Sequence, residues 1–173
     1  TIKYILPIII LLTAAQWSCN KDDDDNPAPT TTNPSAQLTE DEKNDLIFMR
    51  EEEKLARDVY LYNFDRYGVQ IFSKISNSEQ IHMDKVLDLL NTYNIPDPAS
   101  SVKGVFNNTD LQKLYNDLIT ASDKSLLDAL VVGATIEDVD IRDLDEAASS
   151  TSKTDIILTY ENLNCGSRNH IRA

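Results

Sequence analysis

The chain has 173 residues, 41% hydrophobic and 26% charged, a length that suits one globular domain with short appendages. Its two cysteines are too few for a disulfide framework or a thiolate zinc finger. Sixteen basic residues against 29 acidic ones give a net charge of −13, which argues against a nucleic-acid partner. Excess carboxylate either keeps a protein soluble or points inward and holds cations.

Residues 1–18 have the pattern of a secretory signal. Lys3 precedes an apolar run at residues 5–15, which as a helix would span about 16 Å and is too short for a stable transmembrane helix. A basic start, a short apolar middle and small residues before a break are typical of export signals. With Cys19 directly after it, the segment resembles a lipoprotein signal, which implies lipidation of Cys19. The alternative is an ordinary cleaved signal followed by an unmodified cysteine.

Residues 19–38 are expected to form a tether. The run Asp22–Asp25 resembles the acidic export tag of some Gram-negative outer-membrane lipoproteins. The stretch after it is rich in Pro, Thr, Ser and Asn, and cannot bury enough apolar surface to fold. We therefore expect an exported lipoprotein, at the outer membrane or cell surface of a Gram-negative bacterium, that contacts the membrane only through its lipid.

Residues 39–173 are predicted to form one all-α domain. Thr39 and Glu42 match a capping box, and Gly68 is expected to end the first helix. Its inner stripe, at spacings of three and four, comprises Leu46, Met49, Glu53, Ala56, Tyr60 and Phe64. A second helix is predicted from about Val69 to Tyr93, with Ile75, His82, Val86 and Leu89 on one stripe.

Three more helices follow a loop at residues 97–108. A short one, capped by Thr109 or Asp110, precedes a long one opened by Ser122 or Asp123. The inner stripe of that long helix is predicted to be Leu126, Leu130, Ala134, Glu137, Ile141 and Leu144; in the last helix Ile156, Tyr160, Leu163, Ser167 and His170 align. Four long helices and one short helix, between the second and third long ones, predict an antiparallel four-helix bundle.

Five ionisable side chains fall on apolar stripes of four different helices. They are Glu53, Glu79, His82, Glu137 and His170. An isolated ionised carboxylate in a dry core is unstable, so burial requires partners or a metal. Glutamates bridging two metal ions, with one imidazole on each, suit a pair of iron ions, with manganese as the alternative. The Glu79-x-x-His82 spacing places both ligands on one face of a helix.

Each of these residues also has an interpretation that involves no metal. Glu-x-x-His pairs occur on helix surfaces, and the run Glu51–Glu53 has the composition of a solvated face. Glu52, beside Leu55 and Val59, is a conceivable substitute for Glu53. His170, three residues from the end, could be an exposed terminal residue.

The order Glu, Glu-x-x-His, Glu, His along four helices resembles the ferritin-like superfamily of di-iron carboxylate proteins. The stretches 49–60, 133–137, 140–141 and 166–170 resemble a ferritin-like family called DUF2202. The resemblance covers about residues 40–173 and implies a ferritin-like bundle with a di-iron site. One position departs from the general pattern, because Ser167 stands where a glutamate is expected. Asp140, one turn after Glu137, could supply the missing oxygen; otherwise water fills the gap, or one metal alone binds firmly.

We therefore expect a lipid-anchored redox protein that oxidises ferrous iron or reduces oxygen or peroxide at an open coordination position. Tyr60 could hydrogen-bond a ligand or carry an electron, or be an ordinary core aromatic residue. The alternative function is a bundle without catalysis that binds metal or meets a partner through its acidic surface. Association into a homo-oligomer stays open.

Overall fold

The computed structural model describes residues 37–173, and the predictions made for residues 1–36 lie outside this range. The described part is all-α, with five helices and no strand: α1 (Glu40–Tyr67), α2 (Gln70–Thr92), α3 (Thr109–Ser122), α4 (Leu126–Ser150) and α5 (Thr154–Arg172). None of these helices is both long and apolar enough to cross a bilayer. The all-α prediction and the short helix α3 between the second and third long helices are confirmed.

The limits of the first helix follow from its capping residues. The Thr39 side chain accepts a hydrogen bond from the Glu42 N–H, and the Glu42 side chain accepts one from the Thr39 N–H. Gly68 ends the helix with φ 67°, a left-handed conformation that glycine adopts without strain. Both predictions are confirmed.

Two other capping predictions were wrong by one or more positions. Asn108 caps α3 by accepting hydrogen bonds from two backbone N–H groups, whereas Thr109 is already helical. Ser125 caps α4, and Ser122 is the buried last residue of α3. Several adjacent Ser, Asn and Asp residues can each cap a helix, so composition does not select among them.

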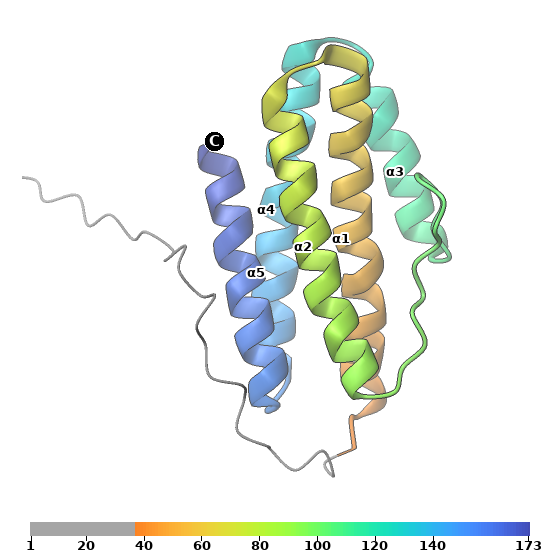
Figure 1. The fold of residues 1–173 in the computed structure, drawn as a ribbon, viewed down its shortest axis with the longest axis vertical. Helices are drawn as coiled ribbons and strands as arrows, with labels where there is room; N and C mark the ends of the chain where they lie inside the picture. The colour runs from red at the N-terminus through yellow and green to blue at the C-terminus, as the bar shows by residue number, and fades with distance from the viewer. Residues whose placement is uncertain (1–36) are drawn as a thin grey trace, which may run out of the picture.

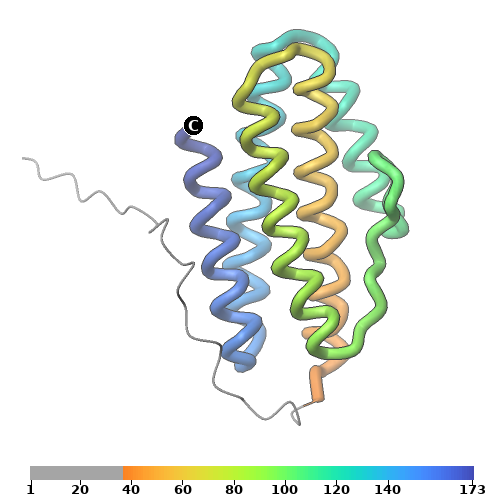
Figure 2. The backbone as a smooth tube through the Cα atoms, viewed as in Figure 1, coloured from red at the N-terminus to blue at the C-terminus, as the bar shows by residue number. Residues whose placement is uncertain are grey.

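The four long helices lie side by side, and each neighbouring pair runs antiparallel (Figure 1). The chain ascends in α1, descends in α2, descends again in α4 and ascends in α5, as the colour change along the tube shows (Figure 2). The loop at residues 93–108 and α3 therefore carry the chain back to the end at which α2 began. Contacts join α1 to α2, α4 to α5, α1 to α4 and α2 to α5.

Apolar layers lie on both sides of a polar layer inside the bundle. One layer contains Leu46, Met49, Val86, Leu144 and Tyr160. The other contains Tyr60, Phe72, Ile75 and Ala129. Along α1 the first layer precedes Glu53 and the second follows it; α2 and α4 also carry residues of both layers on either side of their candidate ligands, and α5 contributes only to the first layer. The packed layers bury the polar residues between them and restrict the access of water.

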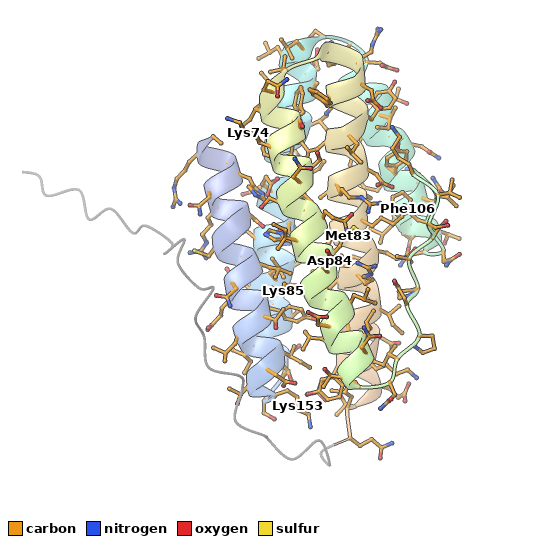
Figure 3. All side chains as sticks on the ribbon, in the orientation of Figure 1. Lys74, Met83, Asp84, Lys85, Phe106 and Lys153 are labelled. Atoms are coloured by element: carbon orange, nitrogen blue, oxygen red, sulfur yellow. The ribbon has the colours of Figure 1, made fainter. Side chains whose placement is uncertain are left out.

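The charged outer face of α1 is covered by the loop at residues 93–108. Arg50 binds Asp97 through two nitrogens, at 3.0 and 2.8 Å. Both oxygens of Glu51 accept backbone N–H groups, from Asn107 at 2.7 Å and Asn108 at 2.9 Å. Further along α1, Lys54 lies 4.3 Å from the ring of Phe106, which is labelled on the α3 side of α1 in Figure 3. The solvated-face interpretation of the acidic run is therefore wrong.

The predicted inner stripe of α4 was wrong in its first half. Leu126 and Leu130 are 39% and 43% exposed, whereas Ala129 and Val132 are buried. From Glu137 onward Glu137 and Leu144 are buried as predicted, whereas Ile141 is only half-buried. Every position from 126 to 132 except Asp128 is apolar, so periodicity alone could not choose the buried face.

Candidate metal centre

The first half of the site joins α1 to α2. Glu53 on α1 and Glu79 on α2 are 0% and 1% exposed. The Nδ1 atom of His82, on α2, lies 3.2 Å from Oε2 of Glu53 and 3.0 Å from Oε2 of Glu79. Glu79 and His82 are three residues apart, and both project from one face of α2 as the spacing predicted.

The second half joins α2 to α4 and α5. The Nδ1 atom of His170, on α5, lies 2.8 Å from Oε1 of Glu79 and 3.2 Å from Oε2 of Glu137, on α4. The rings of His82 and His170 are stacked, with centroids 5.5 Å apart and an interplanar angle of 25°. Glu79 thus presents one oxygen to each histidine. The five predicted residues converge, and His170 does not point away as an exposed terminal residue would.

The donor set forms two overlapping groups, each of a composition suited to a cation. Two trios, Glu53–Glu79–His82 and Glu79–Glu137–His170, each offer one ligand atom per residue, all within 4.8 Å of one another. Oxygen and imidazole nitrogen are the ligand types that iron, manganese and zinc accept. Oε1 of Glu53 is buried and has no hydrogen-bond partner among the described residues, which leaves it available for a ligand bond.

Two glycines allow these side chains to approach. A Cβ atom at Gly166, on α5, would lie 2.4 Å from Nε2 of His82, so the α5 backbone rests directly against that imidazole. A Cβ atom at Gly133, on α4, would lie 3.1 Å from the hydroxyl of Tyr60. That hydroxyl donates a hydrogen bond of 2.6 Å to Oε1 of Glu137. Tyr60 therefore orients a candidate ligand, which was one of its predicted roles.

Asp140 lies beside the centre and contacts the residue that breaks the expected motif. It is 4% exposed, and its Oδ2 atom accepts a hydrogen bond of 2.5 Å from the hydroxyl of Ser167. Its other oxygen has no partner among the described residues. The small side chain of Ser167 leaves room for a carboxylate from α4 next to α5.

The charges of the centre are balanced by the two imidazoles. Burial raises the pKa of Glu53 to about 8, although His82 opposes this. Burial also acts to raise the pKa of Glu79, but its ion pairs with His170 and His82 outweigh it and lower the value to about 2. For His170 burial disfavours the cation, but its hydrogen bonds with Glu137 and Glu79 raise the pKa to about 9. Without metal, the protonated imidazoles therefore provide the positive charge that metal ions would otherwise provide.

Glu52 does not replace Glu53 in either trio, but it is not solvated. It is 6% exposed and lies in the electrostatic field of Asp140 and Asp143. Burial, followed by these two acids, raises the pKa of Glu52 well above its ordinary value. Sequence reasoning missed Asp143 as a partner; the signal was its position three residues after Asp140 on the same helix.

Comparison with known proteins identifies relatives of the same architecture. The family model described as "Uncharacterized protein domain (DUF2202)" matches residues 42–173. The uncharacterized protein MJ0754 of the archaeon Methanocaldococcus jannaschii is 54% identical over 141 residues, covering 81% of this chain and 76% of the relative. The crystal structure of that hypothetical protein has a TM-score of 0.78 and 51% sequence identity, with 85% of this chain and 82% of that chain covered.

The predicted localisation was wrong. Assignment to the outer membrane or surface of a Gram-negative bacterium conflicts with the relative MJ0754, which comes from an archaeon. The prediction depended on an acidic run after a cysteine, and charge composition alone does not identify a type of cell envelope. Lipidation of Cys19, the boundary between signal and tether, and the tether up to residue 36 fall on residues outside the described range.

Proposed function

We propose a function from the geometry, because the chain belongs to the DUF2202 family, whose description states no activity. The proposed function is that of a ferritin-like protein whose centre holds two iron ions, with manganese as the alternative, and performs redox chemistry. The observation that carries this proposal is Glu79, with one oxygen 3.0 Å from His82 and the other 2.8 Å from His170. A carboxylate shared between two nitrogen donors is the arrangement expected of a bridging ligand.

The helix order supports the ferritin-like assignment. In the di-iron carboxylate bundles each of four helices contributes an inward-facing ligand, and here Glu53, Glu79 with His82, Glu137 and His170 come from α1, α2, α4 and α5. The connection through α3 makes α2 and α4 run in the same direction (Figure 2). We propose Asp140 as the sixth ligand, in place of the glutamate absent at position 167.

Each ligand has a distinct task in this proposal. Glu53 with His82 would hold one ion, Glu137 with His170 the other, and Glu79 would bridge them. Two iron ions would supply one-electron steps and a coordination position for oxygen or peroxide. Tyr60 holds Glu137 through its hydroxyl, and the apolar layers containing Met49 and Phe72 restrict water around the site.

The proposal is tested by loading the full-length protein with ferrous iron under anaerobic conditions and counting the metal per chain. We expect two ions, and consumption of oxygen or peroxide when either is admitted. Glu79→Gln should weaken both positions, because Glu79 serves both, whereas Glu161→Gln, an exposed acid on α5, should leave the stoichiometry at two. Metal binding without consumption of either oxidant would instead support a passive metal-binding bundle. Unchanged iron binding by Glu79→Gln would eliminate the site.

A further inference from the structure

An acidic groove lies between α1 and α4. Asp45 on α1 and Asp143 and Glu146 on α4 line it, and Met49 forms part of its wall. Ser150 marks the far end, where its hydroxyl donates a 3.3 Å hydrogen bond to Asp45. Because Met49 is otherwise a core residue, the groove reaches from the surface to the apolar layer below the metal centre.

Glu52 links this groove to the interior. It is 6% exposed, and Asp143, which lines the groove, is close enough to act on its charge. Its Oε2 atom has no hydrogen-bond partner among the described residues, and neither has Oδ1 of Asp140. Two buried carboxyl oxygens without donors are unfavourable unless a cation binds them.

The register of the two helices places these acids in a row. α1 and α4 run antiparallel, with Asp45 bonded to Ser150 near one end and Tyr60 bonded to Glu137 further along. Along α1, Glu52 lies between Asp45 and Tyr60, and along α4, Asp143 and Asp140 lie between Ser150 and Glu137. The acids therefore succeed one another from Asp45 and Glu146 at the surface, through Glu52 with Asp143, to Asp140 beside the candidate ligands.

At one point of the seam between α2 and α5 the two helices approach closely. There the α5 backbone at Gly166 rests on the imidazole of His82, with no room for even a methyl group. Close packing of this kind excludes a hydrated cation. The α1–α4 seam, by contrast, offers carboxylate oxygens that can replace the water ligands of a hard divalent cation one at a time.

We propose that divalent cations reach the centre through the α1–α4 groove. Glu52 and Asp143 form a transient binding site on this route, from which the cations move to Asp140 and the centre. This inference rests on the proposed function, because it needs a metal centre as destination. Glu52 and Asp143 would change the rate at which metal arrives and leave the number of ions bound at equilibrium unchanged.

The test is the rate of cobalt(II) uptake by the full-length protein, followed by stopped-flow absorption, with the final stoichiometry measured separately. Glu52→Gln keeps the size of the side chain and removes its charge. We expect uptake about tenfold slower, with the same final stoichiometry, and a similar slowing for the more exposed Asp143→Asn. The matched control is Asp88→Asn, which removes one charge from the exposed face of α2 and should load at the wild-type rate.

The two proposals fail in different ways. If the wild-type protein binds no cobalt, the metal centre and the route are both wrong. If it binds two ions and both groove variants load at the wild-type rate, the route alone is wrong. Equal slowing by Asp88→Asn would also overturn it, because the effect would then reflect overall charge.

Discussion

The hydroxyl of Ser167 lies 2.5 Å from the carboxylate of Asp140, so that α5 orients an acid carried by α4. Burial raises the pKa of Asp140 well above its ordinary value, and the nearby charges of Glu53 and Glu79 add to this. Without metal, the ionised form of Asp140 is therefore unfavourable, and a bound cation would stabilise it.

Asp140→Asn should therefore change stability and metal affinity in opposite directions. Removal of the buried acid should leave the unfolding free energy of the metal-free protein unchanged or raise it by about 1 kcal/mol. The affinity for the second metal ion should fall by about 10- to 100-fold. Chemical denaturation and metal titration measure the two effects. Ser167→Ala, which removes only the orienting hydrogen bond, should retain both ions with a smaller loss of affinity; unchanged affinity in Asp140→Asn would exclude Asp140 as a ligand.

Gly166→Ala should disrupt the position of His82. Alanine is favoured over glycine within a helix by about 1 kcal/mol, but the new Cβ would lie 2.4 Å from Nε2 of His82. The free-energy cost of displacing the His82 ring should exceed the gain in helix propensity. Metal binding by Glu53 and His82 should therefore weaken. Metal stoichiometry and thermal unfolding check this. Gly133→Ala is the matched control in α4, where the nearest contact is 3.1 Å and a smaller loss is expected.

Tyr60→Phe should destabilise the metal-free protein by about 1–3 kcal/mol, because Oε1 of Glu137 would lose its buried donor. Tyr62→Phe removes a similar hydroxyl, but one that donates to Asp123 at an exposed position. Its effect should stay within about 0.5 kcal/mol. Urea denaturation of both variants provides the comparison, and equal losses would contradict a specific role for the Tyr60–Glu137 bond.

Low pH should weaken the hydrogen bonds that join the start of α1 to the turn between α4 and α5. Burial acts to raise the pKa of Glu42, but the hydroxyl of Thr151, at 2.6 Å, and the N–H of Thr39, at 2.8 Å, outweigh it and lower the pKa below 4.5. Because the folded pKa lies below the unfolded one, the stabilisation is fully present above pH 4.5 and is lost as the pH falls through the folded pKa.

Glu42→Gln should therefore lower the unfolding free energy by about 1 kcal/mol at neutral pH and by less at about pH 3. The exposed Glu40, in the same helical turn, provides the control: Glu40→Gln should not reproduce this change with pH. Denaturation curves at the two pH values distinguish the variants. A constant difference between wild type and Glu42→Gln would show that the carboxylate charge contributes nothing there.

Local patterns were sufficient to predict most helices and the five converging residues. The Thr39 capping box and Gly68 delimit α1 through backbone hydrogen bonds made within a few residues. Helical spacing placed Glu53, Glu79, His82, Glu137 and His170 on apolar stripes, and burial of a stripe is what drives a helix into a bundle.

Only the tertiary structure decided which other acids are buried and why. Glu51 is covered because the loop at residues 93–108 folds over α1 and gives it two N–H donors. Glu52 meets Asp143 because α1 and α4 pack in one register, and Ser167 meets Asp140 because α5 packs on α4. These contacts join residues at least 27 positions apart in the chain. Helical periodicity describes each helix by itself, whereas the partner of a buried charge depends on how the helices pack together.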